Sequence, residues 1–326
     1  MCSSDLRLDA FDADDAGVTA TVADLATGQS KQIRARYLVG ADGASSNVRR
    51  KLDIGLEGSE TLSHSMHVFF KTPDLYGQFG VRPGTFFSAI DKDGYWGNLR
   101  VIDPVAGLWR VLFDVSAETT ANDIDREAIL RRVLARRIDV EWVATSKWTR
   151  RGVVAERFSR GPVFLIGDAV HQVSPTGALG MNTGIADAVD LGWKLAAVLE
   201  GWGGAQLLES YDAERRPASA RNVRMATQFY EGQAQFRQIG AIEDDTSEGQ
   251  AVRDRVGAQM TEYVSRVFRT MGLQIGIRYE NSPVCVPDGT EAPPDDPADY
   301  IATARPGARA PHVALPDGRD RKSTRL

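Results

Sequence analysis

The chain has 326 residues, 42% of them hydrophobic and 25% charged, which is ordinary for a soluble globular protein of about two domains. Its net charge of −5 and the lack of a basic tract argue against nucleic-acid binding, and no apolar run is long enough to span a membrane. Two cysteines exclude a disulfide scaffold and favour a reducing cytoplasm. The four histidines are scattered without a cluster of cysteine or glutamate partners, so we expect no metal site.

The first 60 residues predict a hairpin, a strand and a polar turn. Residues 18–35 alternate between apolar and polar side chains on either side of a turn signal at Thr27-Gly28. The apolar run at 37–41 then ends at Asp42-Gly43, and the serine at 45 or 46 is a suitable N-cap for a helix. An Asp-Gly pair alone is a common turn, so its meaning depends on the rest of the chain.

Residues 61–150 have the pattern of a separate antiparallel sheet. Four strand-like runs, separated by Gly- and Pro-containing turns, occupy residues 67–71, 84–91, 94–102 and 108–115. Apolar residues between 124 and 138 then recur at helical spacing with Asp123 as the expected cap, and residues 140–149 form a further strand. Tyr95, Trp96 and Arg100 lie on these strands, where they either line a pocket or belong to ordinary sheet packing.

A short buried strand followed by an acid and a glycine-rich turn is the most informative segment. Residues 163–166 are apolar, Asp168 follows directly, and a helix is expected to begin near Leu179. The loop carries Gly177, Gly180 and Gly184. In open α/β sheets ligands bind where strands leave the sheet, and free N–H groups at a helix start attract anionic or electron-rich atoms. A carboxylate beside such a helix start indicates a nucleotide cofactor.

The remaining elements are mostly helical. An apolar stripe at helical spacing runs to Glu200 and comprises Ile185, Val189, Trp193, Ala196 and Leu199. A second helix covers 207–215, where Tyr211, Glu214 and Arg215 are interpreted as a structural packing and ion-pair set. His171 adjoins the glycine-rich loop, with a structural or NADPH-side role favoured over proton transfer. A polar loop at 232–250, a helix at 252–271 and a Pro/Asp/Gly-rich linker from residue 282 follow.

Two of these segments resemble fingerprints of the aromatic-ring flavoprotein monooxygenases, the family of para-hydroxybenzoate hydroxylase and phenol hydroxylase. Residues 163–185 resemble its second FAD fingerprint, and residues 36–49 resemble its Asp-Gly fingerprint. Residues 305–315 resemble the opening of the thioredoxin-like tail of the phenol, chlorophenol and polyketide hydroxylase branch. By resemblance, the cofactor-binding residues are Asp42, Gly43, Ser46, Arg49, Gly167, Asp168, Pro175, Gly177, Gly180, Met181 and Asn182.

The resemblance also implies roles within this set. Asp168 would hold ribitol or ribose hydroxyls of FAD, and the guanidinium of Arg49 would pair with a diphosphate. Met181 and Asn182 would contact the flavin ring near N1 and O2 at the helix start, while Pro175 would lie near its reacting face. No catalytic residue, including the group that would activate a phenol, is assigned.

The fold implied by the resemblance is α/β: an incomplete FAD/NAD(P)-binding Rossmann-like domain with an inserted antiparallel-sheet substrate domain. The expected segments are a first FAD-binding part at 1–60, the substrate domain at 61–150, a second FAD-binding part at 151–282, and a linker with a truncated thioredoxin-like domain at 283–326. The implied reaction is hydroxylation of a phenolic or polyketide-type ring through a flavin C4a-hydroperoxide. Its partners would be FAD, NADPH or NADH, O2 and a small aromatic substrate, with a homodimer left open.

The chain departs from the family pattern in three places. The GxGxxG motif that would hold the FAD diphosphate is absent, and Ala178 stands where many relatives have glycine. Residues up to about Leu6 and from Asp320 onward can be translations of opposite strands of one adapter-like DNA string, which predicts an internal fragment of a longer enzyme. The alternatives are therefore a catalytically inert fragment, or another flavoenzyme of the superfamily such as a halogenase or prenyl reductase. The halogenase Trp-x-Trp-x-Ile-Pro signature is absent.

Overall fold

The computed structural model describes residues 5–79, 82–204 and 206–312, so the adapter-like ends at 1–4 and 320–326 and the tail beyond residue 312 lie outside the described residues. The chain forms two compact units. The first unit comprises Met1–Gly58, Gly152–Thr227 and Arg266–Leu326, and the second comprises Ser59–Arg151 and Gln228–Ser265. The chain therefore leaves the first unit twice, at residues 59 and 228, and returns to it each time.

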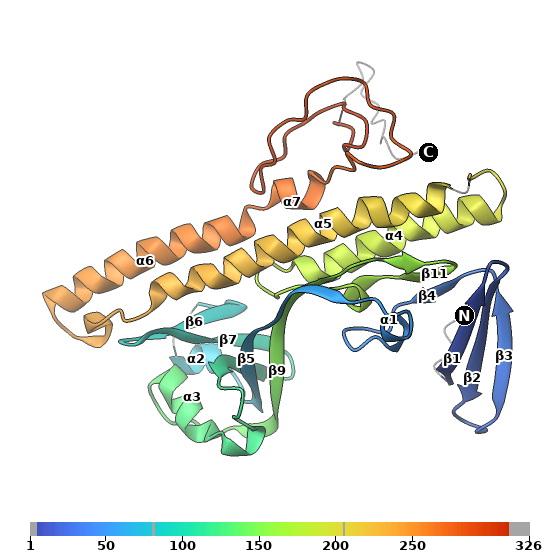
Figure 1. The fold of residues 1–326 in the computed structure, drawn as a ribbon. Coiled ribbons are helices and arrows are strands. Elements are labelled where there is room, and N and C mark those ends of the chain that lie inside the picture. Colours follow the sequence, from blue (N-terminus) through green and yellow to red (C-terminus); the bar gives the residue numbers. More distant parts are fainter. Residues whose placement is uncertain (1–4, 80–81, 205, 313–326) are drawn as a thin grey trace. The chain divides into compact units, whose positions relative to one another are not determined.

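Two small sheets belong to the first unit (Figure 1). Strands β1 (Leu6–Asp14), β2 (Gly17–Asp24) and β3 (Ser30–Ala35) form an antiparallel sheet, which confirms the predicted hairpin and adds β1. The other sheet has the order β10 (Ser159–Arg160), β11 (Val163–Leu165), β4 (Leu38–Gly40). Strand β11 runs parallel to β4, as expected for a Rossmann-like arrangement.

Four α-helices of the first unit are described: α1 (Asn47–Lys51), α4 (Leu179–Leu199), α5 (Gln206–Glu231) and α7 (Met271–Ile275). Helix α5 continues well beyond the predicted end at 215 and on toward the second unit, with Pro217 inside it. The prediction was wrong because a proline removes one helical N–H donor but does not always end a helix. Helix α4 begins at Leu179, as predicted.

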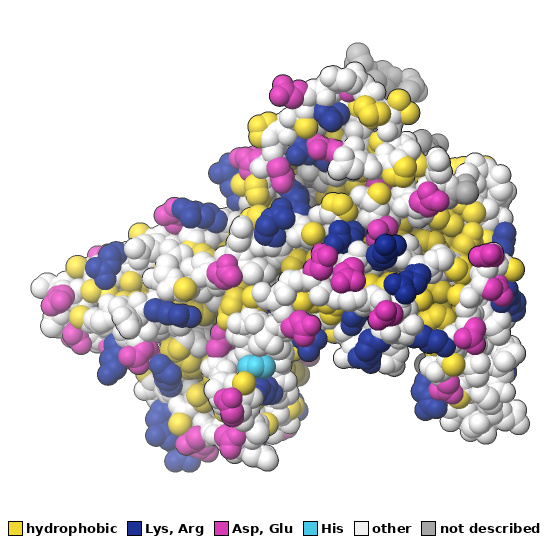
Figure 2. All heavy atoms as spheres, viewed as in Figure 1, with side chains coloured by type: hydrophobic (Ala, Val, Ile, Leu, Met, Phe, Trp, Pro, Cys, Tyr) yellow, Lys and Arg dark blue, Asp and Glu magenta, His cyan; other side chains and the backbone are white. Residues whose placement is uncertain are grey.

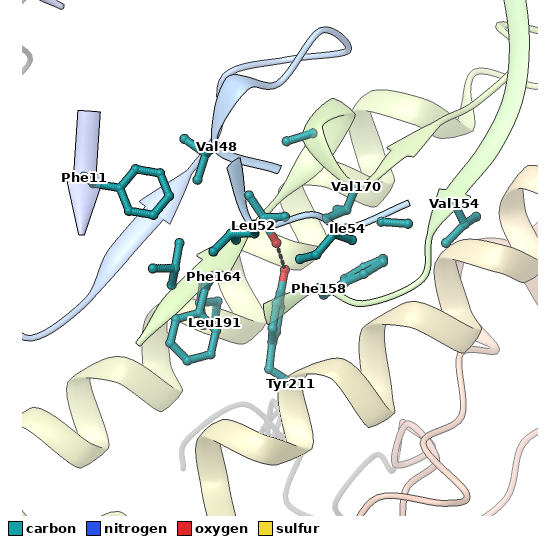
Figure 3. Close-up of a cluster of buried hydrophobic side chains, with 14 of the residues drawn as sticks. Phe11, Val48, Leu52, Ile54, Val154, Phe158, Phe164, Val170, Leu191 and Tyr211 are labelled. Atoms are coloured by element: carbon teal, nitrogen blue, oxygen red, sulfur yellow. Dashed lines mark hydrogen bonds between the residues drawn. The ribbon is translucent and has the colours of Figure 1, made fainter. Parts of the chain in front are cut away.

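The core of the first unit packs strands β4 and β11 against α1, α4 and α5 (Figure 3). At its centre the hydroxyl of Tyr211 donates to the carbonyl of Leu165 at 2.8 Å, and the rings of Phe158 and Phe164 each lie 6.1 Å from the Tyr211 ring. The fully buried tyrosine thereby fixes α5 to the strand that precedes Asp168.

The second unit contains most of a six-stranded sheet with the order β12-β9-β5-β8-β7-β6. The strands are β5 (Leu56–Lys71), β6 (Phe86–Asp91), β7 (Gly94–Asp103), β8 (Leu108–Val115), β9 (Glu141–Ala155) and β12 (His171–Gln172), of which β12 belongs to the first unit. Their positions confirm the predicted antiparallel strands. Helices α2 (Leu75–Phe79) and α3 (Arg126–Leu134) lie along the chain between these strands, and α6 (Ser247–Phe268) follows α5.

The cap of α3 differs from the prediction. Asp125 is the N-cap, and its carboxylate accepts from Ala128 N–H at 3.0 Å. Asp123 instead bonds to Thr120 around the short 3₁₀ turn Ala121–Asp123. Two acids two residues apart offered the same capping signal, and the backbone turn decided between them.

Among the described residues, no helix is both long and apolar enough to cross a membrane, and no group of three or more His, Cys, Asp or Glu side chains could hold a metal ion.

Candidate functional site

The two acidic turns predicted from the sequence meet at one sheet edge. Leu165 pairs with Gly40 in the parallel ladder, so the carboxyl ends of β11 and β4 lie side by side. Asp168 follows three residues after Leu165, and Asp42 follows two residues after Gly40. The amide of Gln172 donates to the carbonyl of Ala44 at 3.0 Å and ties the two loops together. In parallel sheets this edge is where ligands bind.

Asp168 presents a free carboxylate at this edge. It lies in the 3₁₀ turn Gly167–Ala169 and is exposed. No side chain or backbone group among the described residues bonds to its carboxylate, so both oxygens can accept hydrogen bonds from a ligand. The turn depends on Gly167, whose φ of 63° lies in the left-handed region.

The start of α4 leaves its first N–H groups open. No described side chain caps the helix, and its first turn contains no acidic residue. Its N-cap, Ala178, has φ 56° and ψ 35°, and Ala178 N–H donates to the carbonyl of Pro175 at 3.1 Å. Met181 is 77% exposed, and the Asn182 side-chain amide donates back to the Ala178 carbonyl at 3.0 Å. The first turn can therefore receive electron-rich atoms of a ligand.

The side chains of the Asp-Gly fingerprint serve mainly the short helix α1. One Asp42 carboxylate oxygen accepts from Asn47 N–H at 2.7 Å and from Val48 N–H at 3.0 Å, while Ser46 Oγ accepts from Arg49 N–H at 2.9 Å. Partial burial would raise the pKa of Asp42, but hydrogen bonds from Ser46 and the α1 backbone outweigh it and hold the pKa below its ordinary value. The predicted helix start at Ser45 or Ser46 is confirmed, with Ser46 as the N-cap, whereas this capping role of Asp42 was missed.

Gly43 and Arg49 complete that fingerprint in different ways. Gly43 has φ 78°, and a Cβ atom added to it would meet nothing within 4 Å, so the backbone here is open to a ligand. Arg49 is only 7% exposed. Its role toward a diphosphate stays a prediction.

A buried polar network lies behind the Asp168 turn, between α4 and α5. Arg215 Nε donates to Asp187 Oδ1 at 2.9 Å, and Lys194 Nζ donates to Asp190 at 2.7 Å and also to Glu214. The predicted structural set of Tyr211, Glu214 and Arg215 is confirmed, although these side chains are buried instead of lying on the helix surface. Sequence reasoning missed their acidic and basic partners on α4, whose spacing of three and four residues was the available signal.

Helix α4 consequently buries several polar side chains and leaves apolar ones exposed. Thr183, Asp187, Asp190 and Lys194 are buried among its residues. The predicted apolar stripe faces outward instead, with Ile185 54%, Val189 66% and Trp193 44% exposed. Hydrophobic side chains gather beside this helix in the space-filling view (Figure 2). The stripe predicted the helix correctly but not its orientation.

In the second unit, a bulge separates the three sheet residues singled out in the sequence. Ala89 pairs with Gly97 and Ile90 with Tyr95, so Trp96 is the extra residue. Trp96 packs against the apolar cluster that includes α3, with the Arg132 guanidinium 4.3 Å from its ring centre. The Tyr95 hydroxyl instead accepts from the Asn98 amide at 3.4 Å, on the polar face. The side-chain alternation therefore reverses at the bulge.

The polar face of this sheet carries positive charge. Arg100 lies directly opposite Arg110, and among the described residues neither forms an ion pair. Asp114 on the same face accepts from Ser65 at 2.6 Å and from Tyr230 at 2.9 Å. Two neighbouring guanidinium groups without a carboxylate partner make this face suitable for an anionic or acidic group.

His67 lies on this polar face, opposite Leu112 on β8. Burial, together with the charges of Arg110 and Arg150, lowers the pKa of His67 to about 4.

Comparison with known proteins gives a consistent picture. The family model described as "FAD binding domain" matches residues 3–226. An FAD-dependent monooxygenase (opdD) of Penicillium oxalicum is 36% identical over 90% of this chain and 59% of its own length. The 2,4-dichlorophenol 6-monooxygenase of Delftia acidovorans is 32% identical over 92% of this chain and 55% of its own length. The chain thus spans somewhat more than half the length of these relatives.

Solved structures agree in fold. The rebeccamycin biosynthetic enzyme RebC with reduced flavin has a TM-score of 0.83 at 36% identity, covering 94% of this chain and 57% of that one. The flavin-dependent monooxygenase PieE in complex with FAD and substrate has a TM-score of 0.80 at 30% identity, with 94% and 57% covered. The predicted α/β fold is confirmed.

Proposed function

The chain belongs to the FAD binding domain family, and we propose that it is part of an FAD-dependent monooxygenase that hydroxylates an aromatic ring. The observation that carries the proposal is the sheet edge of the first unit. There the carboxylate of Asp168, which bonds to no described residue, stands beside the Asp42-Gly43 turn at the ends of two parallel strands. The chain also provides an uncapped helix start immediately downstream, at Leu179.

Each part of this edge would bind a different part of FAD. The Asp168 carboxylate would accept hydrogen bonds from ribitol or ribose hydroxyls, because an ionised acid is a strong acceptor. The backbone at Met181 and Asn182 would face the polar edge of the flavin ring, where the positive end of the α4 dipole stabilises negative charge. Gly177, Gly180 and Gly43 would leave room for close approach, and Gly43 has open space on its Cβ side.

The cofactor, when bound, would supply the electron transfer and oxygen chemistry, and the chain would supply position and charge. Introducing one oxygen atom of O2 into a ring while the other becomes water takes two electrons, and NADPH or NADH is the proposed donor. We further propose that the second unit is the substrate-binding domain. The positive face bearing Arg100 and Arg110 supports a phenolic or polyketide-type substrate whose hydroxyl can ionise.

Other parts of the proposal rest on the sequence. The segment from 283 onward is proposed as a linker and the opening of a thioredoxin-like domain. A cytoplasmic location is proposed from the scarcity of cysteine, of which Cys285 is a free thiol in the structure. A homodimer is also proposed.

Titration with FAD tests the cofactor site directly. Purified protein should quench flavin fluorescence, and Asp168→Ala should raise the dissociation constant roughly tenfold, as expected for the loss of a hydrogen bond to a charged group. Asp15→Ala, an exposed residue in the β1–β2 turn, is the matched control and should leave the constant unchanged. Absence of FAD binding, or equal loss in both variants, would contradict the proposed site.

Activity is a separate measurement. With FAD present, 2,4-dichlorophenol or a polyketide-type phenol should accelerate oxidation of NADPH or NADH and yield a product with one added oxygen. Cofactor binding without any stimulation by such rings would limit the function of this chain to flavin binding.

A further inference from the structure

Asp187 on α4 is a fully buried carboxylate with three donors around it. Its Oδ2 atom accepts from Gly167 N–H at 3.1 Å and from His171 Nε2 at 2.6 Å, and its Oδ1 accepts from Arg215 Nε at 2.9 Å. Both Asp187 and His171 are 0% exposed. Burying a carboxylate costs free energy unless several hydrogen-bond donors satisfy it. The three donors are therefore held in fixed positions around Asp187.

Two of the three donors flank the proposed cofactor residue. Gly167 immediately precedes Asp168, and His171 follows it by three positions. Among the described residues, the side chain of Asp187 is the acceptor that holds Gly167 N–H. One turn earlier on α4, a Cβ added to Gly184 would lie 3.2 Å from the Cα of Gly167, so helix and turn are in close contact. Helix α4 therefore holds the turn on both sides of Asp168.

The third donor is itself fixed in place. Arg215 donates to the Tyr279 hydroxyl at 3.1 Å and to the carbonyl of Thr183 at 3.3 Å, and it is 0% exposed. A guanidinium bound on several sides cannot swing away from the carboxylate. The position of Asp187 is thus set from α5 and from the segment that follows α7.

We propose that Asp187 is a positioning residue that presets the Gly167–Asp168 turn for the hydroxyls of the flavin side chain. The inference rests on the proposed function, because it assigns Asp187 a task only if Asp168 binds the cofactor. If the turn is already ordered before the cofactor binds, none of the binding free energy is lost in ordering it, and the affinity is higher. His171 then acts as a second anchor of the turn, through its Nε2–H.

The test compares two flavins that differ only in the group Asp168 would bind. Riboflavin carries the ribityl hydroxyls, and lumiflavin has a methyl group in their place. The ratio of their dissociation constants measures hydroxyl recognition apart from ring binding. We expect the wild-type chain to prefer riboflavin about tenfold and Asp168→Ala to lose that preference.

Asp187→Asn is the decisive variant. It keeps the side-chain size but replaces the charged carboxylate by a neutral amide with a single acceptor oxygen, so the charge-assisted hydrogen bonds from Gly167 and His171 weaken and the turn loses its fixed position. The preference for riboflavin should fall to that of Asp168→Ala. Glu214→Gln is the matched control, because it perturbs the same buried network through Lys194 and Ser282 without touching the turn. It should lower the melting temperature and keep the wild-type preference for riboflavin. If Asp187 merely stabilised the fold, Asp187→Asn would likewise lower the melting temperature and keep that preference.

The outcomes separate the two proposals. A riboflavin preference that survives in Asp187→Asn overturns this inference alone. Equal binding of both flavins by the wild type removes the proposed role of Asp168, and the inference with it. If Asp187→Asn does not fold, amide hydrogen exchange of the wild-type chain decides: Gly167 N–H should exchange at least a hundredfold more slowly than an exposed loop amide, and exchange at the loop rate refutes the clamp.

Discussion

Replacing Ala178 by glycine should stabilise the first unit. Ala178 is exposed and has φ 56° and ψ 35°, a left-handed conformation that costs a residue with a Cβ roughly 1–2 kcal/mol. Glycine avoids this cost but loses about 0.5–1 kcal/mol through the greater freedom of its unfolded chain. The expected net gain is therefore about 0.5–1 kcal/mol, which raises the melting temperature of a unit of this size by roughly 1–4 °C.

The matched control is Ala188→Gly on the same helix. Ala188 is also exposed but lies in the helix interior, where glycine should cost about 1 kcal/mol. Thermal melts followed by circular dichroism should therefore move in opposite directions for the two variants. If Ala178→Gly lowers the melting temperature as Ala188→Gly does, the argument from backbone strain is wrong.

Three further predictions concern stability. Ala135→Gly, at φ 54° beyond the end of α3, should raise the melting temperature of the second unit by a similar amount, and a decrease in the melt would refute it. Since the pKa of His67 falls from 6.5 to about 4 on folding, protonation favours unfolding, so stability should be complete above pH 6.5 and decline toward pH 4. His67→Gln should remove that decline from melts across this pH range, and an unchanged profile would contradict it. The pKa of Asp42 is lowered from 3.8, so its contribution is present above that pH and lost as pH falls through the folded value. In denaturant unfolding at pH 7, Asp42→Asn should lower the free energy of unfolding by about 1 kcal/mol. The difference between the variant and the wild type should shrink as the pH falls.

Local patterns predicted most of the elements. Alternation and turn signals located β2 and β6 to β8, and the Thr27-Gly28 turn signal located the fully exposed β3. Strand β1 was missed, although Leu6, Leu8 and Ala10 alternate with polar residues and gave the same signal.

Departures arose where a tertiary contact overrode a local pattern. The bulge at Trp96 reverses the alternation along β7, and nothing in the surrounding sequence marks it. Pro217 is accommodated inside α5 instead of ending it. The apolar stripe of α4 could have faced either way, and the buried partners Asp187 and Lys194 decided the orientation.

The candidate site was predictable in its outline. Asp42 and Asp168 each follow a short apolar strand, and parallel pairing of those strands places both acids at one edge. The sequence could not show that Asp42 would cap α1, because capping depends on the backbone path through Gly43 and Ser46. The family pattern marked Ala178 as a departure from glycine, but only the backbone conformation showed the physical cost of that departure.

The polar side that α4 buries has a consequence for temperature. Heat capacity rises when apolar surface meets water and falls when polar surface does. Separating α4 from α5 would hydrate Asp187, Asp190 and Lys194 as well as apolar side chains, so the heat-capacity increment of this step should be smaller than for a purely apolar contact of equal area. Hydration of charged groups also becomes less favourable on warming. The free energy that attaches α4 should therefore vary less with temperature than that of a purely apolar contact of the same size.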